Sequence, residues 1–172
     1  MTDYASPWRL RMTNDVHDFE GSDGRKVSVD GWVLEDESGE IVYLDENEPV
    51  DDSGRIFYFR VAGVVHHQRW AQGPTCAPLA RVTLDPEPEN PVDPNAIAVH
   101  RSDGQLVGYV PRTLAPTIAI LVAQENRFRL ETIKSVPGAI IRTYADERGS
   151  RNAIEVLAGV NREVDLTRKV AE

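Results

Sequence analysis

The order of a turn, two strands and a helix between Leu84 and Leu121 constrains the fold of this chain more than any other feature. Asp93-Pro94-Asn95 places aspartate and proline where a type I turn favours them. The runs Ala96–His100 and Leu106–Val110 have the composition of strands, and Asp103-Gly104 between them suits a turn that needs positive φ. The sequence therefore predicts a β-hairpin that is entered through a polar loop and followed by a helix.

The helix is expected over about residues 113–125, with Thr113 as its N-cap. Pro116 falls in the first turn, where the missing N–H costs least. Apolar residues recur at helical spacing and predict one buried face. These residues are Leu114, Ile118, Leu121 and Val122.

Further strands are predicted where β-branched and aromatic residues gather or where apolar and polar residues alternate. They are Trp8–Met12, Lys26–Leu34, Ile41–Leu44, Arg55–Val65, Leu79–Leu84, Phe128–Ile133, Ala139–Arg142 and Ala153–Leu157, with a turn at Glu147–Ser150 before the last. In the run Leu79–Leu84 we expect Val82 and Leu84 to face the core. Many short strands with one or two helices predict a mainly β (α+β) protein, an OB-like small β-barrel.

Charge is distributed unevenly along the chain, whose net charge is −9. Residues 1–56 hold 15 acidic and 5 basic side chains, whereas residues 57–172 hold 13 and 14. This division predicts an acidic β-hairpin extension or small subdomain over residues 1–54, a barrel over 55–160 and a charged tail over 161–172. The neutral second part is the more suitable of the two for binding an anionic partner.

Composition also predicts the compartment. The single cysteine, Cys76, cannot form an intramolecular disulfide, which fits a reducing environment. The first residues lack the basic and apolar regions of a secretory signal, and no apolar run approaches the roughly 20 residues that span a bilayer. We therefore expect a soluble cytoplasmic protein without a membrane partner; the sequence predicts no oligomeric state.

The residues from Asn90 to Ala115 resemble a HIRAN domain, a small β-rich module that binds DNA ends and usually accompanies helicases and nucleases. The module's pattern of asparagine, aspartate and apolar residues is followed by a glycine–aromatic strand and a helix. The matching residues are Asn90, Pro91, Asp93, Asn95, Ala96, Ile97, Val99, Gly108, Tyr109, Val110, Arg112, Leu114 and Ala115. Upstream, Val61-Ala62-Gly63 resembles the end of the module's opening strand. The resemblance covers about residues 57–125 well and 126–160 loosely.

The resemblance implies a pocket for the 3′ end of single-stranded DNA. Asp93 matches the carboxylate that binds the terminal hydroxyl, and Asn90 matches an asparagine beside the terminal nucleotide. Tyr109 stands where some members place a phosphate-contacting histidine, and Arg112 stands where a lysine is common. Independently of the family, an arginine beside free N–H groups at a helix start favours phosphate. Equally, Asn90 and Asp93 are residue types that hold turns without any ligand.

Three places depart from the family pattern. Glu89 replaces a polar amide, Val92 replaces a stacking aromatic, and Val65-His66 replaces an arginine–tyrosine pair. Loss of an aromatic platform forfeits about 1–3 kcal/mol for each stacked base. We expect His66, Arg69 and Trp70 to compensate from the same loop.

The sequence argues against metal binding and catalysis. His66 and His67 are neighbours, and adjacent residues of a strand point to opposite faces, so they do not suit one ion. There is no G-x-x-x-x-G-K-[ST] loop for a nucleotide and no recognisable nucleophile triad. We predict neither catalytic residues nor a cofactor.

Three functions follow. The first is nucleic-acid binding, to single-stranded DNA or DNA 3′ ends during repair or processing, with a helicase or nuclease as partner. The second is a protein-interaction adaptor that uses the acidic residues Glu35–Asp52. A third, remoter expectation is an accessory domain of a helicase or hydrolase system, to which family-level zinc or hydrolase labels would attach.

Overall fold

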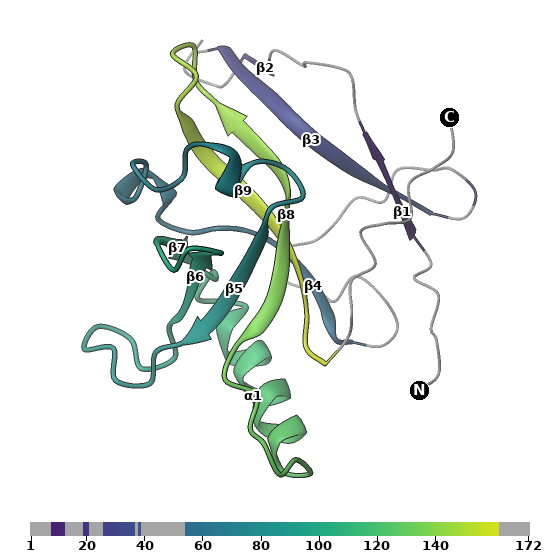
Figure 1. Ribbon diagram of the computed structural model, residues 1–172, viewed down its shortest axis with the longest axis vertical. Helices are drawn as coiled ribbons and strands as arrows, with labels where there is room; N and C mark the ends of the chain where they lie inside the picture. Colours follow the sequence, from purple (N-terminus) through teal and green to yellow (C-terminus); the bar gives the residue numbers. More distant parts are fainter. Residues whose placement is uncertain (1–7, 13–18, 21–25, 37, 39–53, 162–172) are drawn as a thin grey trace.

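The computed structural model describes residues 8–12, 19–20, 26–36, 38 and 54–161, and within them the protein is mainly β with one helix (Figure 1). This confirms the predicted fold class. The predicted strand Ile41–Leu44 lies outside the described residues, as does the tail beyond Asn161. No helix within the described part of the chain is long and apolar enough to cross a membrane.

Six antiparallel strands form the main body, a curled sheet with the helix extending below it in the view of Figure 1. In spatial order they are β4 (Ile56–Arg60), β9 (Arg151–Gly159), β8 (Val136–Ala145), β5 (Arg81–Pro86), β6 (Ile97–Arg101) and β7 (Leu106–Tyr109). Each strand pairs with the next in that order; β5, β6 and β7 are consecutive in the sequence, as are β8 and β9, whereas the β4–β9 and β5–β8 pairs join distant segments.

One residue pair joins the two ends of this sheet. The N–H of Ala62 donates to the carbonyl of Tyr109 at 2.7 Å, and the N–H of Tyr109 donates back at 2.9 Å. Gly108 makes this approach possible, because a Cβ at that position would lie 2.4 Å from the carbonyl oxygen of Ala62. The curled sheet is therefore closed into a barrel beside the end of β7.

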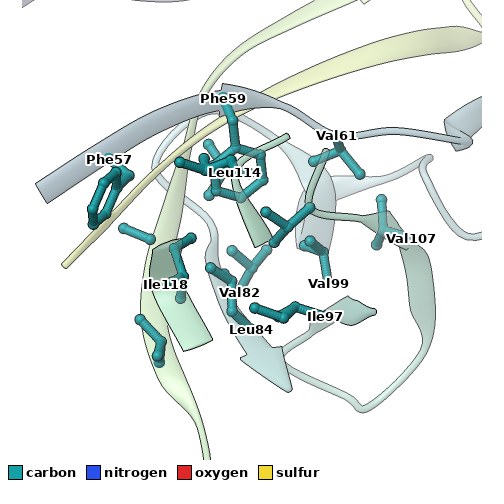
Figure 2. Close-up of a cluster of buried hydrophobic side chains, with 14 of the residues drawn as sticks. Phe57, Phe59, Val61, Val82, Leu84, Ile97, Val99, Val107, Leu114 and Ile118 are labelled. Carbon is teal, nitrogen blue, oxygen red and sulfur yellow. The ribbon is translucent and has the colours of Figure 1, made fainter. Parts of the chain in front are cut away.

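The barrel interior is filled by one face of the strands and by helix α1 (Ala115–Asn126) (Figure 2). Val82 and Leu84 are both buried there, as the alternation in β5 predicts. Other large contributors are Phe57, Phe59, Ile97, Val99, Val107, Leu114 and Ile118. Full burial of each such side chain contributes about 1.5–3 kcal/mol. The predicted helical stripe is confirmed, with Leu121 only partly buried.

The outer face of β4, β8 and β9 carries a second, polar group of side chains around Glu155, which is 3% exposed. Its carboxylate accepts hydrogen bonds from Arg142 Nε at 2.7 Å and Tyr144 Oη at 2.7 Å, and Arg60 Nη2 lies 3.3 Å away. Arg142 also donates to Tyr58 Oη at 2.9 Å. This network links three strands where the sheet is covered on both faces.

The N-terminal strands extend the sheet along β8. β3 (Lys26–Asp36) pairs through Ser28–Gly31 with Arg142–Ala145, while the first half of β8 pairs with β5. β1 (Trp8–Met12) and the short β2 (Phe19–Glu20) pair with β3 in turn. The predicted strands at 8–12 and 26–34 are thus present. The domain boundary near residue 54 remains a prediction.

The predicted strand Phe128–Ile133 is wrong. This segment forms a loop, in which Asn126 Oδ1 accepts the N–H of Ile133 at 2.7 Å and Asn126 Nδ2 donates to the carbonyl of Ile133 at 3.3 Å. Phe128 and Leu130 are fully exposed, so the alternation does not reflect a buried face. The asparagine holds the loop closed between α1 and β8.

Two other predictions need correction. The strand predicted over Arg55–Val65 ends at Arg60, since Gly63 adopts φ 77° and starts a 3₁₀ helix, η1 (Val64–His66). Thr113 does not cap α1, because Leu114 occupies the N-cap position and no side chain bonds there. Pro116 lies in the first turn, as expected.

Candidate nucleic-acid interface

The loop between β5 and β6 is built around the side chain of Asn90. Its Oδ1 accepts the N–H of Val92 at 2.9 Å and of Asp93 at 3.1 Å, and its Nδ2 donates to Glu87 Oε2 at 2.8 Å. Asn90 therefore satisfies the turn and connects it to a carboxylate. The predicted turn-holding function of this residue is present in the structure.

Asp93 uses its two carboxylate oxygens differently. Oδ1 accepts the N–H of Asn95 at 2.9 Å, which continues the turn toward β6. Oδ2 lies 3.8 Å from Arg112 Nε, across the loop. One oxygen thus has a structural function, while the other lies at the surface next to a cation.

Arg112 lies between β7 and α1, with 78% of its side chain exposed. The helix start beside it differs from the expectation of free N–H groups. The N–H of Ala115 donates to Pro111, Pro116 has none, and the N–H of Thr117 donates to Leu114. The guanidinium of Arg112, not the helix terminus, is therefore the phosphate donor that this corner offers.

Tyr109 ends β7 and is half-buried. Burial and the carboxylate of Glu87 both raise the pKa of Tyr109, so the phenol stays protonated and can donate a hydrogen bond. Glu87 faces Tyr109 and accepts from Asn90, so it connects two predicted site residues. Sequence reasoning missed Glu87; its position three residues before Asn90, where the chain turns, was the available signal.

The three candidate residues in and after η1, His66, Arg69 and Trp70, do not all lie together. His66 is exposed and follows Ala62, the residue paired with Tyr109. Arg69 lies over the ring of Trp70 at 4.7 Å, and Arg101 Nη1 donates to the Trp70 carbonyl at 3.0 Å.

Arg101 ends β6 at the opposite end from the Asn90 loop. The structure thus gathers Asn90, Asp93, Arg112 and Tyr109 around one loop and places Arg69 and Trp70 elsewhere. The expected compensation by Arg69 and Trp70 remains a prediction.

Metal ligands and reactive thiols are scarce in the described region. Among residues 54–161 and the described N-terminal strands, no group of three His, Cys, Asp or Glu side chains could hold an ion. Cys76 is buried, and desolvation raises the pKa of its thiol to about 11.

Comparison with known proteins gives one family and one solved structure. The family profile of the HIRAN domain matches residues 55–156. The crystal structure of the HIRAN domain of human HLTF is similar at 19% sequence identity and a TM-score of 0.40, over 62% of this chain and 78% of that one. A search of curated proteins found no match.

Proposed function

The chain belongs to the HIRAN family, whose members are DNA-binding modules, and from this premise we propose that it binds the 3′ end of single-stranded DNA through the Asn90–Asp93 loop. The observation that carries the proposal is the pairing of Asp93 Oδ2 with Arg112 Nε at 3.8 Å. An acceptor for a sugar hydroxyl and a donor for a phosphate therefore lie side by side at the surface.

The chemistry of the two groups suits a strand terminus. An ionised carboxylate only accepts hydrogen bonds, so Asp93 binds a terminal hydroxyl and repels a terminal phosphate. Arg112 offers the planar donors that match a phosphodiester, and its exposed side chain is free to turn toward one. Asn90 keeps the Asp93 carboxylate in place by binding the Asp93 N–H.

The electrostatics favour local recognition over general attraction. The chain carries a net charge of −9, and non-specific binding needs many cations along the phosphate backbone. A terminus offers directional hydrogen bonds that do not depend on a wide positive surface. DNA repair or processing, a helicase or nuclease partner and a cytoplasmic location belong to the same proposal.

The test compares two fluorescent oligonucleotides that differ only at the 3′ end, a hydroxyl or a phosphate, by anisotropy. Wild-type protein is expected to prefer the hydroxyl form, and Asp93→Ala is expected to remove that preference by weakening hydroxyl binding about tenfold, as for loss of a charged hydrogen bond. Equal losses on both oligonucleotides would reduce Asp93 to a structural residue.

The chain offers a matched control for this experiment. Like Asp93 Oδ1, Asp146 Oδ1 accepts backbone N–H groups of its own turn, those of Arg148 at 2.9 Å and Ser150 at 3.0 Å, between β8 and β9. Asp146→Ala removes the same kind of turn hydrogen bond without touching the Asn90 loop. Its binding should equal that of the wild type.

A further inference from the structure

Four residues on neighbouring strands form a straight row across the outer face of the barrel. Asp85 pairs with Ala98, Ala98 pairs with Tyr109, and Tyr109 pairs with Ala62. Directly paired residues project from the same face of a sheet. Ala62 is exposed, whereas Ala98 is fully buried, so the surface on this part of β6 is formed by the larger side chains around it. The row lies directly beyond the Asn90 loop, at the end of β5 and the start of β6.

His100 stands on the same face, two residues beyond Ala98 along β6. Its Nδ1 lies 2.6 Å from Asp85 Oδ2, and the same carboxylate accepts from Thr83 Oγ1 at 2.9 Å and from Ser135 Oγ. Three side chains therefore converge on Asp85, and the imidazole is held in one orientation. Its other nitrogen, Nε2, makes no hydrogen bond within the described part of the chain.

The Asp85 carboxylate determines which groups can bind His100 Nε2. Asp85 accepts only, so Nδ1 carries a proton, and in a neutral imidazole Nε2 is then an acceptor that disfavours phosphate. When the ring is protonated, Nε2 becomes a charged donor. Phosphate binding at this atom therefore requires the protonated ring, which acid favours.

We propose that His100, oriented by Asp85, is a phosphate-binding residue for the strand whose 3′ end occupies the Asn90 loop. The inference rests on the proposed function and extends its site over the outer face of β5, β6 and β7. Tyr109 lies between the loop and His100 on that face, so one extended strand can contact all three. The ligand group is an internal phosphodiester, distinct from the terminal group at Asp93.

The charged and titratable groups around the His100 imidazole can be named from the strand pairing. On the same face, the charged or titratable groups of the neighbouring strands are Arg81 and Asp85 on β5 and Tyr109 on β7. Arg101 follows His100 on β6, and Lys134 comes just before Ser135. Partial burial raises the pKa of Asp85, but hydrogen bonds from Ser135, His100 and Thr83 outweigh it and lower that pKa. Asp85 is therefore ionised at neutral and mildly acidic pH.

The experiment measures affinity of the full chain for a 5′-labelled hexathymidylate with a 3′-hydroxyl, at pH 5.5 and pH 8. We expect wild-type binding to weaken about tenfold at pH 8, corresponding to one charged hydrogen bond. His100→Gln should remove this difference, and at pH 5.5 it should reduce the salt slope by about 0.7, the value for one phosphate on a single strand. His67→Gln, which removes a histidine from the loop after η1, should keep both.

A second set of measurements identifies which phosphate His100 binds and checks that each variant is folded. Neutral methylphosphonate linkages are introduced one at a time, and the effect of His100→Gln should vanish at one linkage only. Asp85→Asn, which keeps the histidine but not its orientation, should weaken binding at pH 5.5 to an intermediate degree. Thermal melts confirm that each variant is folded.

The outcomes separate the two proposals. If His100→Gln leaves the pH profile and salt slope unchanged while Asp93→Ala still abolishes the preference for a 3′-hydroxyl, the further inference is overturned and the proposed function stands. If the wild type binds neither oligonucleotide, both are overturned. Loss of the His100→Gln effect at a single methylphosphonate linkage supports the inference.

Discussion

Ala62 and Tyr109 exchange two backbone hydrogen bonds, and this pair closes the barrel next to the candidate interface. The chain reaches Ala62 directly after Val61, whose N–H still donates to Ile154 on β9 at 2.8 Å. Within two residues the strand therefore changes its neighbour from β9 to β7. The position of Tyr109 depends on this closure, which ties the binding surface to the packing of the barrel.

The closure predicts that Gly108→Ala destabilises the fold. The added Cβ would lie 2.4 Å from the Ala62 carbonyl oxygen and 2.6 Å from the Val61 side chain, so the strands must separate. We expect a loss of about 1–3 kcal/mol in urea denaturation, as for overpacked cores. Gly104→Ala, in the open turn at φ 88°, should cost about 1 kcal/mol from backbone conformation alone. An unchanged midpoint for Gly108→Ala would contradict the closure.

The polar network predicts that Glu155→Ala is among the most damaging substitutions. It would leave the Arg142 guanidinium partly buried without its carboxylate partner, at a cost of about 3–5 kcal/mol. Tyr144→Phe removes one hydrogen bond to the same carboxylate and should cost less, about 1.5–3 kcal/mol. Calorimetric melting of both variants measures the difference, and similar small losses would show that the network is unimportant.

The lowered pKa of Asp85 predicts how stability depends on acid. A carboxyl group whose folded pKa lies below its unfolded value of about 3.9 stabilises the fold above that value and loses this contribution as pH falls through the folded pKa. Asp85→Asn should therefore be less stable than the wild type at pH 6, with the difference shrinking toward pH 3. Urea midpoints at both values test this, and a constant difference would exclude ionisation as its cause.

The exposed position of Arg112 predicts a change in salt dependence without a change in fold. Arg112→Gln removes the proposed phosphate contact, so the slope of log affinity against log salt should fall by about 0.7. Its side chain is 78% exposed, and its pairing with Asp93 at 3.8 Å is worth little to stability. Arg148→Gln, in the β8–β9 turn, is the exposed control and should leave the slope unchanged.

Local chemistry explains which parts of this fold the sequence predicts. The buried faces of β5 and α1 can be predicted from residue spacing alone, because the apolar residues within each element define which side is buried. The turn at Asn90 is equally local, because its amide bonds groups within three residues. Phe128–Ile133 shows the limit: its alternation is that of a strand, but Asn126 bonds Ile133 and closes a loop instead.

The remaining features depend on strand register, which no local pattern encodes. Asp85 and His100 are 15 residues apart, and Ser135 follows 50 residues after Asp85, yet all three meet at one carboxylate. The Ala62–Tyr109 closure likewise needs the whole order of the sheet. The sequence could therefore predict the candidate loop and its arginine, whereas the surface beyond them required the structure.

Strand β3 covers part of one edge of β8. β3 covers the backbone of Arg142–Ala145, so removing it by proteolysis or truncation would leave half of that strand with unsatisfied N–H and C=O groups. Such an edge recruits strands from other molecules. A shortened chain would thus expose a template for self-association, and its solubility, more than its DNA binding, would reveal the loss.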